Sequence, residues 1–139
     1  MLLFLISGIL FQFIDVSGQG TPYNFNEDEI KLILHEHNRY RASEPAANMQ
    51  ELVIQYPVWN ENLVDVAREW ATKCIGDHRP NRSFKAGFAA VGENLWWTSS
   101  SVLWKNLRRV IWDFYREKYI YDFNTGYCPP GQLCGHYTQ

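Results

Sequence analysis

Apolar residues recur at helical spacing in a segment that starts near residue 26. Asn26 is a favourable N-cap residue, and Glu29 stands three positions later, where its carboxylate can reach back to the cap. Pro45 cannot continue a helix. We therefore predict a first helix that begins after Asn26 and ends before Pro45. The positions that recur on its inner face are Ile30, Ile33, Leu34, His37 and Tyr40.

A second segment, starting at Asn60, has a clean one-sided apolar stripe and is predicted to be a helix. Because Cys74 closes this stripe, we expect its thiol to be buried. Gly76, Pro80 and Asn81 indicate a loop after the helix, and residues 95–98 are predicted to form a short strand. The stripe consists of Leu63, Val66, Ala67, Trp70, Ala71 and Cys74.

A third and longest helix is predicted over residues 100–121. Glu117 falls on its apolar face, where a carboxylate is costly unless it is paired or lines a solvated cavity. An ion pair with Arg108, Arg109 or Lys118 is the simplest alternative. The positions on this face are Leu103, Leu107, Val110, Phe114, Glu117 and Tyr121.

The N-terminus has the pattern of a secretory signal peptide, although no Lys or Arg precedes its apolar run. Residues 2–14 are almost entirely apolar, and Val16 and Gly18 supply the small residues of a cleavage site after Gly18. The run is too short for a comfortable membrane span, which needs ~20 apolar residues. We predict a signal peptide at residues 1–18, with an uncleaved anchor as the alternative, and hence a secreted, extracellular protein without a stable membrane span after cleavage.

Composition narrows the functional classes. The chain has 139 residues and a net charge of -2, which argues against nucleic acid, since that partner requires a clustered basic face. With six Trp, eight Tyr and eight Phe, the chain can build a packed interior and an apolar binding surface. Tyr119, Tyr121 and Phe123 could line an apolar groove, or they could simply pack in the core.

Secretion changes the interpretation of the three cysteines, because disulfides persist in an oxidising compartment. Cys128 and Cys134 flank a turn-forming Pro-Pro-Gly stretch, so we predict a local bridge between them. Cys74 is then a free thiol, part of an intermolecular bond, or lacks its partner. Asn81-Arg82-Ser83 is a glycosylation sequon, so Asn81 is a candidate glycosylation site.

Four residues could carry chemistry. They are two imidazoles, His78 and His136, and two carboxylates, Glu93 and Glu117, which together could hold a divalent metal with open positions or act as general acid and base. Their spacing is no standard zinc signature and no nucleophile motif accompanies them. Each also has an ordinary alternative: a loop histidine, a turn partner or an ion-paired carboxylate.

Several segments together resemble the CAP superfamily of cysteine-rich secretory, antigen 5 and pathogenesis-related proteins (the SCP domain), and its venom allergen-like and glioma pathogenesis-related branches above all. The resemblance covers essentially all of the chain after the signal peptide. The matching segments are His37-Asn38 with Arg41, Ala47-Asn48-Met49, Trp59, Cys74 with His78, Gly92-Glu93-Asn94-Leu95, Tyr115 with Glu117, Tyr121-Asp122-Phe123, and Gly135-His136-Tyr137-Thr138-Gln139.

The resemblance implies an α+β fold, a three-layer α-β-α sandwich with a small central sheet. It implies that His78, Glu93, Glu117 and His136 converge in one open cavity, where the two histidines bind zinc or another divalent ion. It further implies a secreted, non-enzymatic module that binds sterols, other small lipids or extracellular proteins. A metal-dependent, protease-like hydrolase at the same cavity and a non-functional fragment are the alternatives.

The chain also departs from the family pattern. Phe114 stands where the family usually has tryptophan, and residues 54–57 lengthen a loop. The family continues past Thr138-Gln139 into an apolar strand, a second signature and further cysteines. We therefore expect residues 27–139 to be a CAP domain that is incomplete at its C-terminus, with part of the central sheet and the partner of Cys74 missing. A truncated gene product or a partial gene model would account for this.

Overall fold

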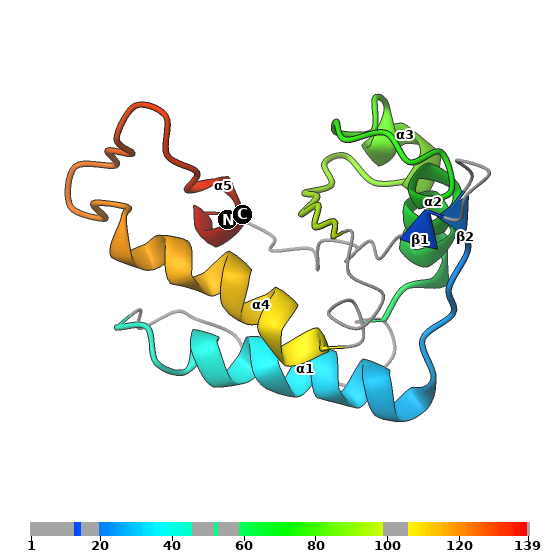
Figure 1. The fold of residues 1–139 in the computed structure, drawn as a ribbon, viewed down its shortest axis with the longest axis horizontal. Coiled ribbons are helices and arrows are strands. Elements are labelled where there is room, and N and C mark those ends of the chain that lie inside the picture. Colours follow the sequence, from blue (N-terminus) through cyan, green and yellow to red (C-terminus); the bar gives the residue numbers. More distant parts are fainter. Residues whose placement is uncertain (1–12, 15–19, 46–51, 53–58, 99–105, 139) are drawn as a thin grey trace.

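The fold was analysed in a computed structural model, which describes residues 13–14, 20–45, 52, 59–98 and 106–138. It is built mainly from helices (Figure 1). In chain order the elements are β1 Phe13–Ile14, β2 Gly20–Thr21, α1 Glu27–Arg41, α2 Glu61–Ala71, α3 Arg82–Ala86, α4 Leu107–Tyr115, the 3-10 helix η2 Arg116–Tyr119, and α5 Gly135–Thr138.

The predicted start of the first helix is confirmed. The Asn26 side chain accepts a hydrogen bond from the Glu29 backbone N–H at 3.0 Å, and the Glu29 carboxylate accepts one from the Asn26 N–H at 2.9 Å. Acidic residues fill the first turn and Arg39 and Arg41 the last, as the helix dipole favours. The helix ends at Arg41, before Pro45.

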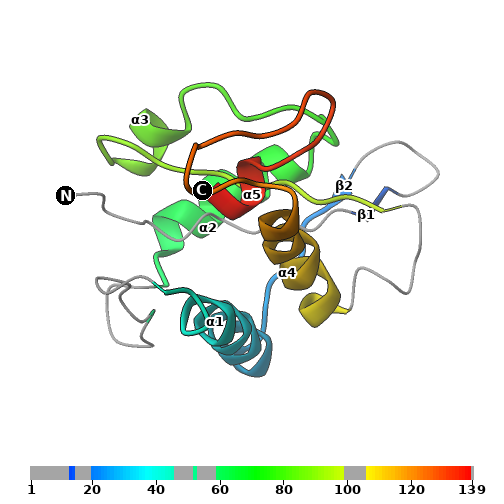
Figure 2. The same ribbon diagram turned by 90° about the vertical axis from the view of Figure 1, so that its left-hand side faces the viewer.

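Helices α1 and α4 pack against each other and form the main core (Figure 2). Ile33 of α1 is fully buried among apolar residues of α4, and each such side chain stabilises the fold by about 1.5–3 kcal/mol. The predicted inner positions of both helices are therefore confirmed for these residues. The buried cluster consists of Ile33, Leu107, Val110, Ile111 and Phe114.

Helix α2 begins after Asn60 as predicted, with the Asn60 side chain accepting from the backbone N–H of Asn62 and Leu63. Trp70 and Ala71 form a second core cluster with Leu95 packed against it. The prediction of a buried Cys74 was wrong: its thiol is half-buried and free. The helix ends at Ala71, and Cys74 lies beyond it at a φ of 53°, so it does not continue the stripe.

The third predicted helix is shorter than its apolar pattern. Helix α4 begins at Leu107, because the Asn106 side chain caps it by accepting from the Arg109 N–H at 3.1 Å. After Tyr115 the chain tightens into η2, which ends at Tyr119. Leu103 lies outside the described residues. Glu117 is buried as predicted, but in a 3-10 turn rather than in an α-helix.

The predicted central sheet is not confirmed. In the part of the chain that the structure describes, the strands are β1 and β2, an antiparallel pair with Phe13 opposite Thr21 and Ile14 opposite Gly20. Residues 95–98 run without strand structure apart from a bridge position at Leu95, so the predicted strand was wrong. A strand requires a partner for its backbone groups, and among the described residues no strand is paired with residues 95–98. The helices expected of an α+β fold are present.

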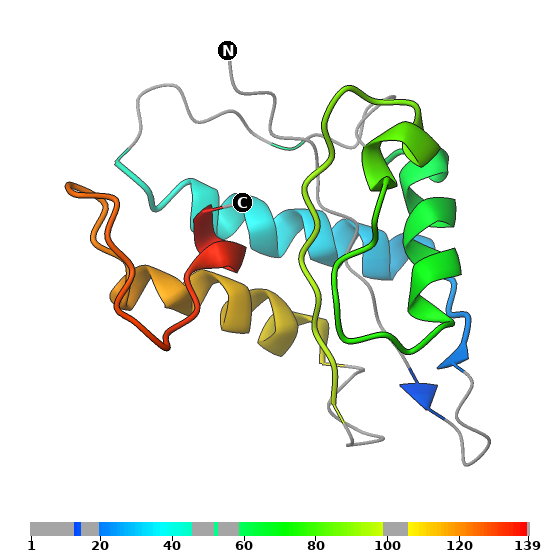
Figure 3. The ribbon, with the colours of Figure 1, turned by 90° about the horizontal axis from the view of Figure 1, so that it is seen from above.

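Helices α2 and α3 lie at one end of the molecule, and the loop after η2 lies at the other (Figure 3). The segment of residues 92–96 lies in the middle of the molecule, between these two ends (Figures 1 and 3). No helix within the described ranges is long and apolar enough to cross a membrane. Most of the predicted signal peptide, the family segment at 47–49 and the insertion at 54–57 fall outside the described residues.

Candidate functional site

His78 and Glu93 form the first of two histidine–glutamate pairs. The Glu93 Oε1 accepts hydrogen bonds from His78 Nδ1 at 2.8 Å and from the Arg79 backbone N–H at 2.9 Å. The carboxylate is buried, whereas the His78 side chain is 54% exposed. In this pair the buried Glu93 carboxylate therefore holds the His78 imidazole in a position that is open to solvent.

The loop that carries His78 is fixed to α2 by its neighbours. The Trp70 indole donates to the Asp77 carbonyl at 2.8 Å. The buried Arg79 guanidinium donates to the Glu69 carboxylate at 2.6 Å and to the Val66 carbonyl. The hydrogen bond from Arg79 lowers the pKa of Glu69. Arg79 thus holds the backbone N–H that binds Glu93, and the sequence pattern gave no sign of this role.

Glu117 and His136 form the second pair. Glu117 Oε1 accepts from His136 Nδ1 at 2.6 Å, and its other oxygen accepts from the backbone N–H of His136 at 2.9 Å and of Tyr137 at 3.3 Å. The predicted alternative, an ion pair of Glu117 with Arg108, Arg109 or Lys118, is not what the structure shows. Phe114 stacks on the His136 ring with 4.7 Å between ring centroids.

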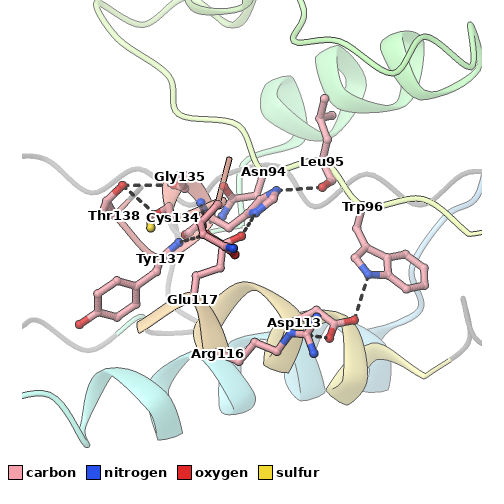
Figure 4. Close-up of polar contacts among 12 residues, drawn as sticks. Asn94, Leu95, Trp96, Asp113, Arg116, Glu117, Cys134, Gly135, Tyr137 and Thr138 are labelled. Atoms are coloured by element: carbon pink, nitrogen blue, oxygen red, sulfur yellow. Dashed lines mark hydrogen bonds and ion pairs between the residues drawn. The ribbon is translucent and has the colours of Figure 1, made fainter. Parts of the chain in front are cut away.

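The second nitrogen of His136 is also engaged. His136 Nε2 lies 3.1 Å from the Leu95 carbonyl, and the Asn94 amide donates to the His136 carbonyl at 3.3 Å (Figure 4). Oxygen atoms of the Glu117 carboxylate and the Leu95 carbonyl therefore lie within hydrogen-bond distance of both ring nitrogens of His136.

The four predicted site residues thus form two pairs, and the same short segment, residues 93–95, contacts both. Glu93 serves the first pair and Leu95 the second, two residues apart, which is ~7 Å of extended chain. Within the described ranges, no three His, Cys, Asp or Glu side chains are placed to hold one metal ion.

The residues fit the predicted zinc site only in part. A zinc-binding histidine commonly donates its other nitrogen to a carboxylate, and the contact from His78 to Glu93 has that form. His136 makes the same contact to Glu117, but its remaining nitrogen faces the Leu95 carbonyl. An ion held by both histidines would have to displace that carbonyl, so the zinc site stays a prediction.

A second set of contacts holds α5 beside η2. Glu44, which follows α1, accepts from the Tyr137 hydroxyl at 3.0 Å and from Lys118 Nζ at 2.8 Å. Burial, followed by the hydrogen bond to Glu44, raises the pKa of Tyr137 to about 12. Burial alone would raise the pKa of Glu44, but hydrogen bonds from Lys118, Tyr115 and Tyr137 outweigh it and lower that pKa.

Residues 119–133, here called the apolar loop, join η2 to the segment before α5. The predicted Cys128–Cys134 disulfide is present and joins the second half of this loop to the residue before α5. Tyr119 and Phe123 are strongly exposed rather than packed in the core, while Tyr121 is half-buried beside Tyr137, with ring centroids 6.0 Å apart. The large apolar residues exposed on the loop are Tyr119, Ile120, Phe123, Tyr127 and Leu133.

Comparison with known proteins settles the family. The model of the cysteine-rich secretory protein family, CAP, matches residues 34–139. This chain belongs to the CAP family. The CAP match contains His78, Glu93, Glu117 and His136, the four residues that form the two pairs.

Curated relatives agree with this assignment. The chain is 36% identical over 118 residues to glioma pathogenesis-related protein 1 of Mus musculus, covering 82% of this chain and 43% of the relative. It is 39% identical over 112 residues to GLIPR1-like protein 1 of Bos taurus, covering 78% of this chain and 43% of the relative. With peptidase inhibitor 16 of Mus musculus it shares 32% identity over 122 residues, 86% of this chain and 22% of the relative.

The chain therefore spans less than half the length of these three relatives. No solved structure matches it significantly.

Proposed function

We propose that this CAP domain is a secreted, non-enzymatic binding module that takes a sterol or another small lipid on the apolar loop. The observation that carries the proposal is the exposure of large apolar side chains there, with Phe123 78% and Leu133 69% exposed. Asp122 is the one charged residue in the loop. Exposed apolar surface of this kind is typical of ligand and lipid contact sites.

Contacts within the loop hold its conformation without a ligand, which reduces the entropy lost on binding. Asp122 accepts from the Asn124 N–H at 2.9 Å and from the Thr125 hydroxyl at 2.7 Å, and it bridges to Tyr127. The hydrogen bonds from Thr125 and Asn124 lower the pKa of Asp122, so the carboxylate stays ionised and the turn stays closed near neutral pH.

The two ends of the apolar loop are clamped together at its base. Glu117 precedes the loop and His136 follows it, and they are joined through the 2.6 Å contact between Oε1 and Nδ1. Lys118 and Tyr137 are joined in the same way through Glu44. In this proposal the Glu117–His136 pair is a support for the binding loop rather than a reactive centre.

The hydrolase alternative receives less support from the geometry. Water activation by a metal requires an open coordination position beside a base. His136 has no nitrogen left for a metal as placed, so that position would need Leu95 to move. Peptidase inhibitor 16, one of the relatives above, carries an inhibitor's name, which is compatible with a non-enzymatic module that contacts extracellular proteins.

The test is binding of a fluorescent sterol by the purified secreted protein. Phe123→Ser and Leu133→Ser should each weaken binding at least ~10-fold, because each removes apolar contact worth about 1.5–3 kcal/mol when buried. Phe84→Ser is the matched control, since Phe84 is also strongly exposed but lies on α3. Unchanged binding in the loop variants, or peptide hydrolysis abolished by His78→Ala, would overturn the proposal.

A further inference from the structure

The side chain of Phe84 is open to solvent in the part of the chain that the structure describes. It is 88% exposed, more than any other large hydrophobic residue that the structure describes. Phe84 belongs to α3, at the opposite end of the molecule from the apolar loop (Figure 3). The lipid site proposed above therefore does not account for it.

Asn81 lies at the start of the same short helix. Asn81-Arg82-Ser83 is the one Asn-X-Ser/Thr triplet in the sequence. Asn81 is exposed, adopts a left-handed turn with a φ of 57°, and its side chain makes no capping hydrogen bond. The carboxamide is therefore not used by the helix that it precedes.

Asn81 and Phe84 are neighbours in space. The Asn81 carbonyl accepts from the Lys85 N–H at 3.0 Å, which makes it the residue that opens the first turn of α3. Phe84 is the third residue of that turn. Asn81 and Phe84 are three positions apart in this turn, the spacing at which residues are neighbours on a helix surface, so a group attached to Asn81 starts on the same part of the surface as Phe84.

We propose that Asn81 carries an N-linked glycan whose first N-acetylglucosamine covers Phe84. In the attachment step, Asn81 Nδ2 displaces the diphosphate of a lipid-linked oligosaccharide from the anomeric carbon of the sugar. An N–C bond replaces the C–O bond, the amide gives up one proton, and the lipid diphosphate leaves. The apolar C–H face of the sugar then packs on the ring, which removes aromatic surface from water.

The folded structure is compatible with this order of events. In the fold, the Ser83 hydroxyl accepts from the Val91 N–H at 2.7 Å, so the hydroxyl of the sequon is already engaged. Attachment during translocation, before folding, leaves that contact free to form later. The glycan then occupies solvent above α3 and displaces no buried group.

The first arm of the test measures attachment. This inference rests on entry into the secretory pathway, so the full chain is translated with microsomes, once as it is and once behind a proven secretory signal. Behind that signal we expect a mass increase of one glycan that peptide N-glycosidase removes. Asn81→Gln should abolish the increase, and Ser83→Thr should retain it.

A missing increase behind the proven signal overturns the glycan itself. A missing increase with the native N-terminus alone contradicts the proposed secretion instead. The two failures are therefore distinguishable, and neither depends on whether the variants fold.

The second arm measures the contact with Phe84. In the secreted glycoprotein, Phe84→Ala should lower the unfolding midpoint by about 4 °C, and trimming the glycan to one N-acetylglucosamine should preserve this shift. Complete removal of the glycan should abolish it. Phe123→Ala is the matched control and should show no dependence on the glycan. A shift at Phe84 that is equal with and without the glycan, or absent in both, would overturn the contact.

Discussion

The two histidine–glutamate pairs share one chemistry and differ in surroundings. His78 is 54% exposed and has Glu93 as its ring contact, whereas His136 is 24% exposed and has acceptors at both ring nitrogens. Glu117 also accepts hydrogen bonds from two backbone N–H groups of α5, whereas Glu93 accepts one, from the backbone N–H of Arg79. The same residue types therefore support a fold in one place and present an imidazole to solvent in the other.

The largest expected difference between the pairs is in stability. Glu117→Ala leaves the half-buried His136 ring and two backbone donors without their partner, so we expect the loss of three hydrogen bonds to lower the free energy of unfolding by about 3–5 kcal/mol. Glu93→Ala should cost about 1–3 kcal/mol, because exposed His78 can bind water instead. Urea unfolding of both variants gives the comparison, and an equal or larger loss for Glu93→Ala would break it.

Zinc affinity separates the pairs next. The zinc site is a prediction from the family resemblance. If zinc binds at His78, whose side chain is 54% exposed, His78→Ala should remove that binding and Glu93→Gln should weaken it by about 10–100-fold. We expect His136→Gln to leave the affinity unchanged. Isothermal titration with zinc alone measures this, and an equal loss in both histidine variants would show one shared ion, as the family resemblance implies.

A smaller effect is expected at the contact between Tyr137 and Glu44. Tyr137→Phe removes one hydrogen bond at the base of the apolar loop and should cost about 1 kcal/mol. Tyr119→Phe is the control, because the Tyr119 side chain is strongly exposed. Thermal unfolding of the two variants tests the assignment, which is wrong if they shift the midpoint equally.

The smallest expected effect is a pH dependence of the free energy of unfolding, caused by Tyr137 where the two ends of the apolar loop meet. The pKa of Tyr137 is raised to about 12 in the fold, above its ordinary 10.0, so the folded state favours the protonated hydroxyl. Its contribution to stability is complete below pH ~10 and is lost as the pH rises toward about 12. Unfolding measured across this range should be flatter in Tyr137→Phe than in the parent; an unchanged slope would contradict it.

Local signals predicted the helices well where a cap marked them. Asn26 with Glu29 and Asn60 fixed the starts of α1 and α2, because capping is chemistry between near neighbours. The apolar pattern predicted too long a third helix, because apolar residues at helical spacing continue beyond both ends of α4. The helix itself is limited by the Asn106 cap and by the change to η2 after Tyr115. The strand at 95–98 failed because strand formation depends on a partner elsewhere.

The site divides in the same way. The position of Glu117 on a buried face was visible from periodicity. His78, Glu93 and His136 were candidates by residue type alone, and the resemblance implied that they lie together with Glu117. Arg79 and Glu44 were missed because their partners, Glu69 and Tyr137, are set by tertiary packing. The engagement of His136 by the Leu95 carbonyl has no sequence signature at all.

The central claim is that His136 supports the apolar loop and His78 does not. The most direct measurement compares fluorescent-sterol binding, with amide hydrogen exchange over residues 119–133, in His136→Gln and His78→Gln. We predict that His136→Gln weakens binding at least ~10-fold and speeds exchange in the loop, while His78→Gln changes neither, because His136 belongs to the contacts that close the base of the loop and His78 does not. Equal effects of the two variants, or sterol binding that survives His136→Gln unchanged, would contradict the account.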